Sequence, residues 1–509
     1  MKSVLFIGTL AAMLVLAILF SGCTNPTPAP VCGDKNCGAG ETITSCPKDC
    51  NMALPAEKCG NGICEGPETS TNCPADCSGA PAKGKCGDGT CEGPETAANC
   101  PTDCNKASSS NSGSITKGFA MGFGGIEQNG KDIEQNDLSL FKESGATWMR
   151  RNCWFSPEGS FILEGGDISI LVGNDINLLN TIEPSGDQPP SDYTVFKEKL
   201  RELVLNEKAY VKYWQLGNEP DLMWAKNGKT EEDYVTFFLE LQPVIREACP
   251  ECIIVLGSTT KSPCNAGNKY DYFKKVLTEI RARSPDAKPF DVFDFHLYPM
   301  DGAYTCVEAA APSYRALLTE TGYDSNIEFT NSETGVYSGL PNGGPLGSIT
   351  NAHFQSEQTQ AKMLVKFYAI FFNSGVSKIF WLSLINPYKI GHSPVEGGVE
   401  DLQGLAYNGK GSYDLNNNIP AGTKKEAFYA YKTLTSKVQG MTQSEKIADY
   451  VYRFSNSNKA VYVAWNDSGG KLLAQISGTV RVTDYLGNEQ TINAEDVTLT
   501  DSPVFIEEP

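Results

Sequence analysis

The chain has 509 residues, more than one ordinary domain holds, so we expect two to four modules. Hydrophobic residues make up 40% of it, enough for a sizeable core, and its formal net charge is −19. A surface of that charge repels nucleic-acid phosphates, which argues against a nucleic-acid partner and for a neutral or cationic one.

The first 23 residues have the layout of a secretory signal: one lysine, an uncharged apolar run and small residues before Cys23. The ending LFSGC resembles a lipobox, in which the cysteine carries a lipid and becomes the new N-terminus, although Phe20 stands where leucine is usual. The alternative is an uncleaved anchor, because residues 4–20 are nearly long enough to span a membrane. Both interpretations predict export, and the lipobox predicts an extracellular lipoprotein anchored to the membrane through Cys23.

Three repeats follow the signal. Twelve of the 18 cysteines form three C-x4-C-x8-C-x3-C units, which begin at Cys32, Cys59 and Cys86, 27 residues apart. Each unit is too short for an apolar core, so cross-links must replace one. In an exported protein four cysteines predict two disulfides per unit, and three connectivities remain open.

Metal binding is the alternative for these repeats. Four thiolates suit zinc, but an oxidising compartment weakens that interpretation. Calcium is the second possibility, because Asp88, Glu92 and Glu95 surround a glycine turn in DGTCEGPE. We favour disulfide-linked spacers over residues 24–104, followed by a flexible Ser-rich linker over residues 105–117.

From residue 118 onward, short apolar runs alternate with amphipathic helical patterns such as 191–208 and 356–375, which predicts βα units and a parallel sheet. Eight strands within about 270 residues are typical of a (β/α)8 TIM barrel, an α/β fold, here expected over residues 118–437. The segment 157–175, between the second and third strands, has no convincing helix. The expected strands are 118–125, 146–152, 176–184, 211–220, 252–260, 290–299, 327–335 and 378–387.

Polar side chains gather where these strands end. A barrel builds its chemistry at the carboxyl ends of its strands. Each residue alone could cap a loop or form a salt bridge on the rim, but two carboxylates with five such partners on one face are hard to explain as packing. In chain order they are Arg150, Asn218, Glu219, His296, Tyr298, Glu333 and Trp381.

These residues make the chain resemble the clan A glycoside hydrolases, retaining enzymes built on a (β/α)8 barrel. Asn218-Glu219, in WQLGNEP, matches their acid/base position, and Glu333, in SETG, matches their nucleophile. The HLY of strand six and the tryptophan of strand eight match as well. The resemblance covers roughly residues 118–436 and looks most like families 39 and 5; the short second crossover departs from both.

The resemblance implies a retaining β-glycosidase, in which two carboxyl groups divide the work. Glu333 would attack the anomeric carbon, while Glu219 would protonate the leaving oxygen and later deprotonate water. Arg150 and Tyr298 would hold Glu333 ionised and oriented, and Asn218 would contact the sugar 2-hydroxyl.

Further substrate contacts are expected from His296 and from tryptophans. Trp381 would offer an apolar face for a pyranose. Trp224 and Trp154 could extend it, but for at least one of these two we favour a buried core position.

A metal site in the barrel is not expected. The whole chain has three histidines, at positions 296, 353 and 392, too few for a zinc or two-metal hydrolase. We therefore expect no cofactor.

The remaining cysteines fit structural roles. Cys249 and Cys252 lie at the amino end of a strand, the stability face of a barrel, which predicts a structural disulfide rather than redox chemistry. Cys264 and Cys306 are expected to bridge across the rim, leaving Cys153 as a buried thiol.

The tail begins after a last barrel helix at 424–440. Runs of period two separated by close turns predict a small antiparallel β-sandwich over residues 438–509. No row of exposed aromatics marks it as a carbohydrate-binding module, so we expect it to pack against the barrel.

We therefore expect a monomeric, surface-anchored retaining β-glycosidase acting on a plant-type or microbial polysaccharide or oligosaccharide. The alternative is a catalytically silent barrel that serves as a sugar-binding or adhesion lipoprotein.

Overall fold

The structure is a computed structural model, and the predicted signal, repeats and linker lie outside the residues it describes, as do His353, His392 and Cys264. Within the described part, no helix is both long enough and apolar enough to cross a membrane. The described residues are 118–124, 135–164, 168–186, 188–261, 271–284, 286, 288–299, 304–339, 354–387, 400–410, 414, 417–472 and 476–508.

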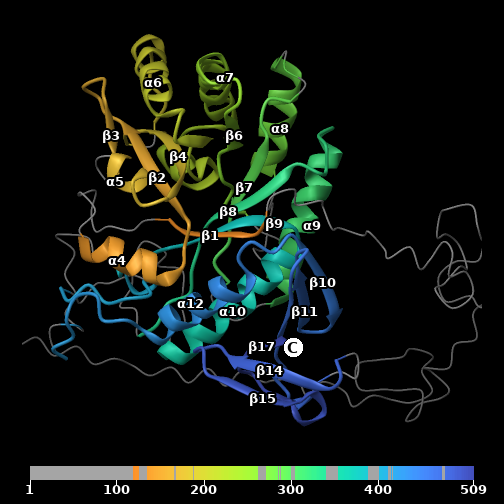
Figure 1. Ribbon diagram of the computed structural model, residues 1–509. Helices are drawn as coiled ribbons and strands as arrows, with labels where there is room; N and C mark the ends of the chain where they lie inside the picture. Colours follow the sequence, from red (N-terminus) through yellow and green to blue (C-terminus); the bar gives the residue numbers. More distant parts are fainter. Residues whose placement is uncertain are drawn as a thin grey trace, which may run out of the picture. The chain divides into compact units, whose positions relative to one another are not determined.

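Eight parallel strands among the described residues close into a barrel, which confirms the predicted (β/α)8 fold (Figure 1). The sheet runs β1-β9-β8-β7-β6-β5-β4-β2, and β1 also pairs with β2, which closes the ring. The strands are β1 (Ala120–Phe123), β2 (Trp148–Phe155), β4 (Asn177–Pro184), β5 (Val211–Leu216), β6 (Ile253–Leu256), β7 (Val292–His296), β8 (Glu328–Thr334) and β9 (Val376–Trp381).

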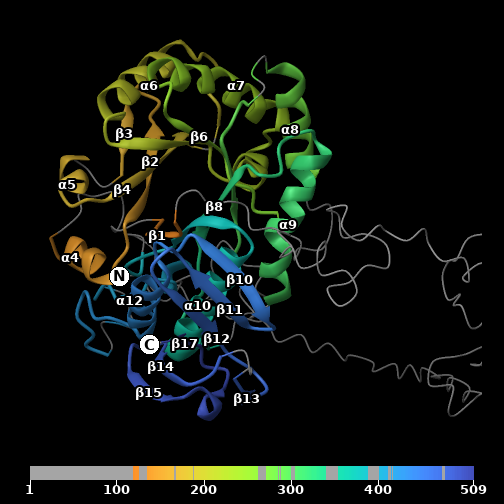
Figure 2. The ribbon, with the colours of Figure 1, turned by 45° about the vertical axis from the view of Figure 1, so that its right-hand side comes forward.

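Helices lie around the outside of these strands (Figures 1 and 2). Helix α7 begins at a capping box, in which Thr230 and Asp233 satisfy each other's backbone N–H groups, and Ser356 caps α10. The helices are α4 (Gln135–Ser144), α6 (Thr194–Glu207), α7 (Glu231–Ala248), α8 (Asp271–Arg283), α9 (Tyr304–Glu320), α10 (Glu357–Asn373) and α12 (Glu426–Val438).

The crossover from β2 to β4 is irregular, as the sequence predicted. It holds β3 (Phe161–Leu163), which pairs antiparallel with β2, and the five-residue helix α5 (Ile168–Val172). The hairpin places Glu164, the residue after β3, within hydrogen-bonding distance of the backbone of β2.

The floor of the barrel sets the direction of the side chains above it. Leu179, Tyr213, Val255, Val292 and Phe380 form an apolar cluster of their own. Successive side chains of a strand point to opposite faces, so the residue two positions further on points into the same interior. The second layer is therefore polar: Thr181, Gln215 and Asp294 stand directly above this floor.

Strand β8 carries one extra residue near its carboxyl end. Asp294 and His296 of β7 are two residues apart, whereas their partners Thr330 and Glu333 are three apart. The same irregularity appears against β9, where Asn331 and Thr334 pair with Ile379 and Trp381. A bulge of this kind turns the strand and breaks the alternation, so that Ser332 and Glu333 both reach the site.

The C-terminal domain contains a six-stranded sheet in the order β10-β11-β12-β17-β14-β15. Its strands are antiparallel, as predicted from the sequence. The two-stranded ribbon of β13 (Gly470–Lys471) and β16 (Thr498–Leu499) supplies a reduced second layer, since Leu472 and Leu499 share a core with the sheet. The sheet strands are β10 (Gln443–Ala448), β11 (Val451–Ser455), β12 (Ala460–Ala464), β14 (Thr479–Asp484), β15 (Glu489–Asn493) and β17 (Val504–Glu507).

This sheet packs against the barrel, as expected. Strands β10 and β11 lie next to α10 (Figure 2). The ring of Phe454 meets that of Phe119 edge-on at 5.7 Å, and the buried Lys366 of α10 reaches Asp467 at 2.7 Å. The tail thus completes the core on one side of the barrel.

The cysteine predictions hold where the structure describes them. Cys249 and Cys252 form a disulfide just before β6, and Cys153 is a free, buried thiol whose pKa is raised by burial. Cys306 is in a disulfide; because Cys264 lies outside the described residues, their pairing stays a prediction.

Candidate active site

The barrel brings two glutamates together around one histidine. His296 Nδ1 lies 2.6 Å from Glu219 Oε1 and 2.7 Å from Glu333 Oε2. The three facing atoms all lie within 4.8 Å of one another. The imidazole side chain is 1% exposed, whereas the carboxylates are 13% and 16% exposed, so solvent reaches the glutamates but hardly reaches the ring.

Glu219 is presented by an unusual turn at the end of β5. Gly217 has φ +86°, and a Cβ there would lie 2.9 Å from the ring of Tyr234, so the position requires glycine. Glu219 itself adopts a left-handed conformation with φ 42°, and Pro220 then begins a π-helical turn. Such a conformation costs a non-glycine residue about 1 kcal/mol and is found preferentially at functional sites.

Arg150 and Tyr298 support the pair in different ways. Arg150 donates from Nη2 to Asn218 Oδ1 at 2.7 Å and from Nε to Gln215 Oε1 at 3.1 Å. It therefore orients Asn218 and acts on Glu333 through its charge. Tyr298, in contrast, hydrogen-bonds to Glu333 directly.

Glu333 and His296, which contact each other, carry opposite charges. Burial raises the pKa of Glu333, but the charges of His296 and Arg150 and the hydrogen bonds from His296 and Tyr298 outweigh it and lower the pKa to about 2. Burial lowers the pKa of His296, but the charge of Glu333 and hydrogen bonds to both glutamates raise it to about 10. At neutral pH an imidazolium therefore faces an ionised Glu333.

Glu219, His296 and Glu333 also offer three potential metal-ligand atoms. A nitrogen must lose its proton before it can bind a metal. His296 Nδ1 holds a proton shared between two carboxylates, and the raised pKa of the imidazole opposes its loss. The geometry is that of a proton site, and we assign no metal to it.

Two predicted sugar-binding tryptophans are not at the surface. Trp381 follows Phe380, which fills the barrel floor, so alternation turns Trp381 outward, where its ring packs against Tyr368 of α10. Trp224 packs against Phe237 of α7 at 5.0 Å. Both are fully buried. The expectation of an open platform is wrong for Trp381, whereas Trp224 is the buried core tryptophan that the sequence favoured for one of the pair Trp154 and Trp224.

Other apolar residues lie on the inner face instead. Trp154 shares a face of β2 with Arg150 and is partly exposed. Leu382, the residue after Trp381, is half-buried and approaches Gly124 on the inside of the barrel. These two side chains are the better candidates for apolar contact with a sugar.

Sequence reasoning missed several polar groups under and beside the pair. Asp294 and Ser332 lie beneath His296, and Gln215 links Asp294 to Arg150. The period of two in Asp294-Phe295-His296 was a usable signal for the first. Glu164, with no signal in its surroundings, is a buried carboxyl whose pKa burial raises to about 7.

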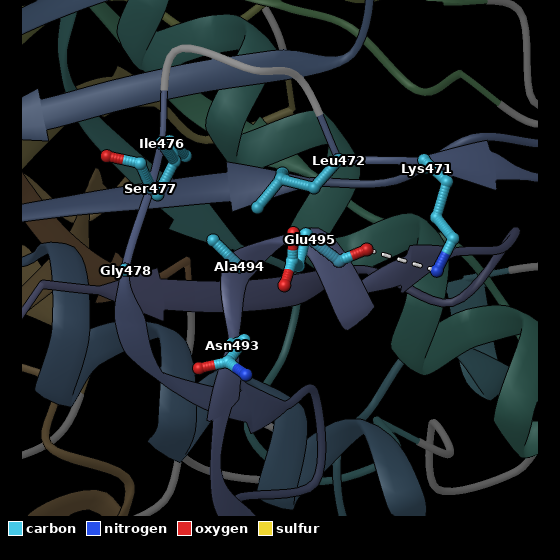
Figure 3. A pocket seen from close by; sticks show the side chains of 8 residues that line it. All are labelled: Lys471, Leu472, Ile476, Ser477, Gly478, Asn493, Ala494 and Glu495. Atoms are coloured by element: carbon cyan, nitrogen blue, oxygen red, sulfur yellow. Dashed lines mark hydrogen bonds between the residues drawn. The ribbon is translucent and has the colours of Figure 1, made fainter.

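A pocket in the C-terminal domain carries no comparable chemistry (Figure 3). Its one glutamate, Glu495, accepts a hydrogen bond from Lys471 through its backbone carbonyl. Its described lining residues include neither a second carboxylate nor an aromatic ring.

No protein-family model matches the chain, and no curated protein is similar to it in sequence. Among solved structures, a family 39 glycoside hydrolase from the gut symbiont Bacteroides cellulosilyticus WH2 is similar, with 16% identity and a TM-score of 0.57. The match covers 78% of this chain and 82% of that one. A glucosidase from Croceicoccus marinus matches with 12% identity and a TM-score of 0.51, over 77% of this chain and 95% of that chain.

These similarities show that the chain has a barrel fold found among glycoside hydrolases. They include family 39, one of the two families whose motifs the sequence resembles.

Proposed function

We propose that the protein is a retaining β-glycosidase that hydrolyses a polysaccharide or oligosaccharide by double displacement. One observation carries the proposal: an oxygen of Glu219 and an oxygen of Glu333 lie within 4.8 Å of each other, and both glutamates contact Nδ1 of His296. Retaining enzymes hold their two carboxyl groups about 5–5.5 Å apart, whereas inverting enzymes leave about 6.5–9.5 Å for a water molecule.

The first step uses the charges already present. Glu333, ionised by its surroundings, attacks the anomeric carbon and forms a glycosyl ester, while Glu219 gives its proton to the leaving oxygen. Tyr298 donates to Glu333 and keeps its attacking oxygen oriented. Asn218, whose Oδ1 accepts a hydrogen bond from Arg150, would contact the sugar 2-hydroxyl.

The second step reverses the proton transfer. Glu219, now a carboxylate, takes a proton from water, whose oxygen attacks the anomeric carbon. The ester bond breaks, Glu333 regains its charge, and the product keeps the configuration of the substrate.

The proposed cellular setting rests on the sequence. The signal-like first 23 residues and the LFSGC ending support export and a lipid anchor at Cys23. The cysteine repeats would then act as disulfide-linked spacers that hold a monomeric catalytic domain away from the membrane, with bound calcium as an alternative.

Activity is tested with aryl β-glycosides and with β-glucans, xylans and mannans, and the anomeric configuration of the first product is read by NMR. We expect turnover with retention on at least one substrate. Glu333→Ala should abolish it, and azide should restore release of the aryl group with an inverted glycosyl azide as product. Glu202→Ala, at an exposed glutamate of α6, is the matched control.

Three results would count against the proposal. Inverted product from the unmodified protein would exclude double displacement. An azide product of retained configuration would exchange the roles of the two glutamates. Binding to a glycan without turnover of any substrate would favour the silent sugar-binding alternative.

A further inference from the structure

A buried chain of hydrogen bonds lies beneath the glutamates. His296 Nε2 is 3.0 Å from Ser332 Oγ, and Ser332 Oγ donates to Asp294 Oδ2 at 2.6 Å. All three side chains are nearly or fully buried. Because Nδ1 of the same ring faces Glu219 and Glu333, the chain connects Asp294 to both glutamates.

Asp294 is held by four hydrogen bonds. Oδ2 accepts from Ser332 Oγ and from Gln215 Nε2, at 2.6 and 2.8 Å. Oδ1 accepts from Thr330 Oγ1 at 2.6 Å and from the backbone N–H of Ser332 at 3.0 Å. Burial raises the pKa of Asp294; the charge of His296 and the hydrogen bonds from Ser332 and Thr330 oppose that rise without cancelling it.

The charges of the site can then be counted. With Asp294 ionised against the imidazolium, two cations (Arg150 and His296) face three carboxyl groups (Asp294, Glu219 and Glu333). The five groups are neutral together when Glu219 holds a proton, which is the state that the first step needs. When Glu333 becomes an ester they are neutral again with Glu219 ionised, which is the state that the second step needs.

We propose that Asp294 and Ser332 are positioning residues that hold His296 as a cation between the two glutamates, so that proton transfer at Glu219 stays matched to the charge of Glu333. This inference rests on the proposed glycosidase function. Neither residue touches the substrate; both act through the imidazole ring.

Other titratable groups face the same cluster and could also affect the titration of His296. Tyr298 hydrogen-bonds to Glu333, and burial raises its pKa well above the usual value. Glu164, on the β3 side, interacts with Glu333, and its pKa is raised by burial to about 7. Asp221 interacts with Glu219, and burial raises its pKa to about 6. These carboxyls titrate at lower pH than His296 and do not replace Asp294 as its partner.

The first measurement follows His296 without using activity. The whole chain has only three histidines, so their imidazole NMR signals can be assigned by substitution. In the unmodified protein we expect His296 to stay protonated through pH 8. Asp294→Asn and Ser332→Ala should each lower its titration midpoint by at least one pH unit. Ser332→Thr keeps the hydroxyl, so it should leave the titration midpoint of His296 close to that of the unmodified protein.

Thr334→Val is the matched control for Ser332. It removes another buried hydroxyl from β8, one that donates to the carbonyl of Leu297 at 2.7 Å and lies outside the chain to Asp294. It should leave the titration of His296 in place. Near-UV circular dichroism checks that each variant is folded. The Asp294 and Ser332 variants each break the hydrogen-bond chain to His296 at a different residue, so either one alone tests it.

The second measurement compares two leaving groups. For a poor leaving group, which needs protonation by Glu219, Asp294→Asn should lower kcat/KM at least tenfold and move the alkaline limb of the pH profile to lower pH. For an activated leaving group the loss should be several-fold smaller. A merely structural defect would lower both equally.

Unchanged titration of His296 in both Asp294→Asn and Ser332→Ala would overturn the inference, as would equal losses on the two substrates. A protein that turns over no glycoside would instead refute the proposed function. The titration would still decide whether Asp294 and Ser332 hold the charge of His296.

Discussion

Glu164 offers a test of the electrostatics that needs no substrate. The residue is 9% exposed, and its Oε2 accepts a hydrogen bond from the backbone N–H of Asn152 at 3.0 Å. Burial raises the pKa of this carboxyl from 4.5 to about 7, with an opposing contribution from Arg150 and a further increase from Glu333. In the unfolded chain the carboxyl is solvated and has its ordinary pKa.

The magnitude follows from linkage. Between pH 4.5 and pH 7 the folded protein binds more protons at Glu164 than the unfolded chain does, so the free energy of unfolding falls as pH rises through this window. One unit of pKa difference corresponds to about 1.4 kcal/mol. The difference between 4.5 and about 7 therefore removes about 3 kcal/mol of stability between pH 4 and pH 8.

Glu164→Gln should abolish this dependence, because the amide does not ionise yet can still accept the hydrogen bond from Asn152. We expect the variant to gain about 3 kcal/mol over the unmodified protein between pH 4 and pH 8, measured by urea unfolding of the barrel. All other titrating groups cancel in this comparison. Glu202→Gln, at a side chain that is 53% exposed, should show no such gain.

The result that would refute the reasoning is a difference between variant and unmodified protein that stays constant from pH 4 to pH 8. It would mean that Glu164 has the same proton affinity folded and unfolded, and that its carboxyl is not desolvated.

Three further predictions do not depend on the protonation of the Glu164 side chain. Glu219→Ala should slow hydrolysis of unactivated glycosides at least a hundredfold but spare the first step for activated ones, as burst kinetics would show. Equal losses on both kinds of substrate would show that Glu219 is not the general acid. Arg151→Met should lower the free energy of unfolding in urea by about 3–5 kcal/mol, because it leaves Glu207, now 2.9 Å from the Arg151 guanidinium, buried without that partner. The double variant with Glu207→Met should recover most of this loss. A chain beginning at Ser114 should match the full chain in specific activity and thermal midpoint, and a large loss on soluble substrate would make the repeats part of the catalytic unit.

The strands of the barrel were predictable because each is an apolar run that ends at polar or glycine residues. WQLGNEP shows how closely local chemistry and position agree: a buried strand, a glycine that permits the turn, and then the asparagine and glutamate of the site. The irregular crossover after β2 was also visible, since residues 157–175 contain no amphipathic stretch long enough for a full helix.

The buried support of the site was not predictable, because it depends on register between strands. Ser332 reaches His296 and Asp294 only because β8 carries an extra residue opposite β7. Nothing in NSETG indicates a bulge, and strict alternation would have turned either Ser332 or Glu333 away from the site. Glu164 was hidden for a similar reason, since a three-residue strand in a short hairpin has no periodicity to read.

The tryptophans show where reasoning from residue type fails. Trp381 was placed in the site because it ends a barrel strand, but that position alone does not say which way a side chain points. Phe380 belongs to the apolar floor, so Trp381 must face the helices and Leu382 the interior. The same rule puts Trp154 inside, because it shares its face of β2 with Arg150. A sugar in this barrel would therefore meet a leucine on the β9 side and a tryptophan on the β2 side. The aromatic contribution to binding should come from the strand that also carries the arginine.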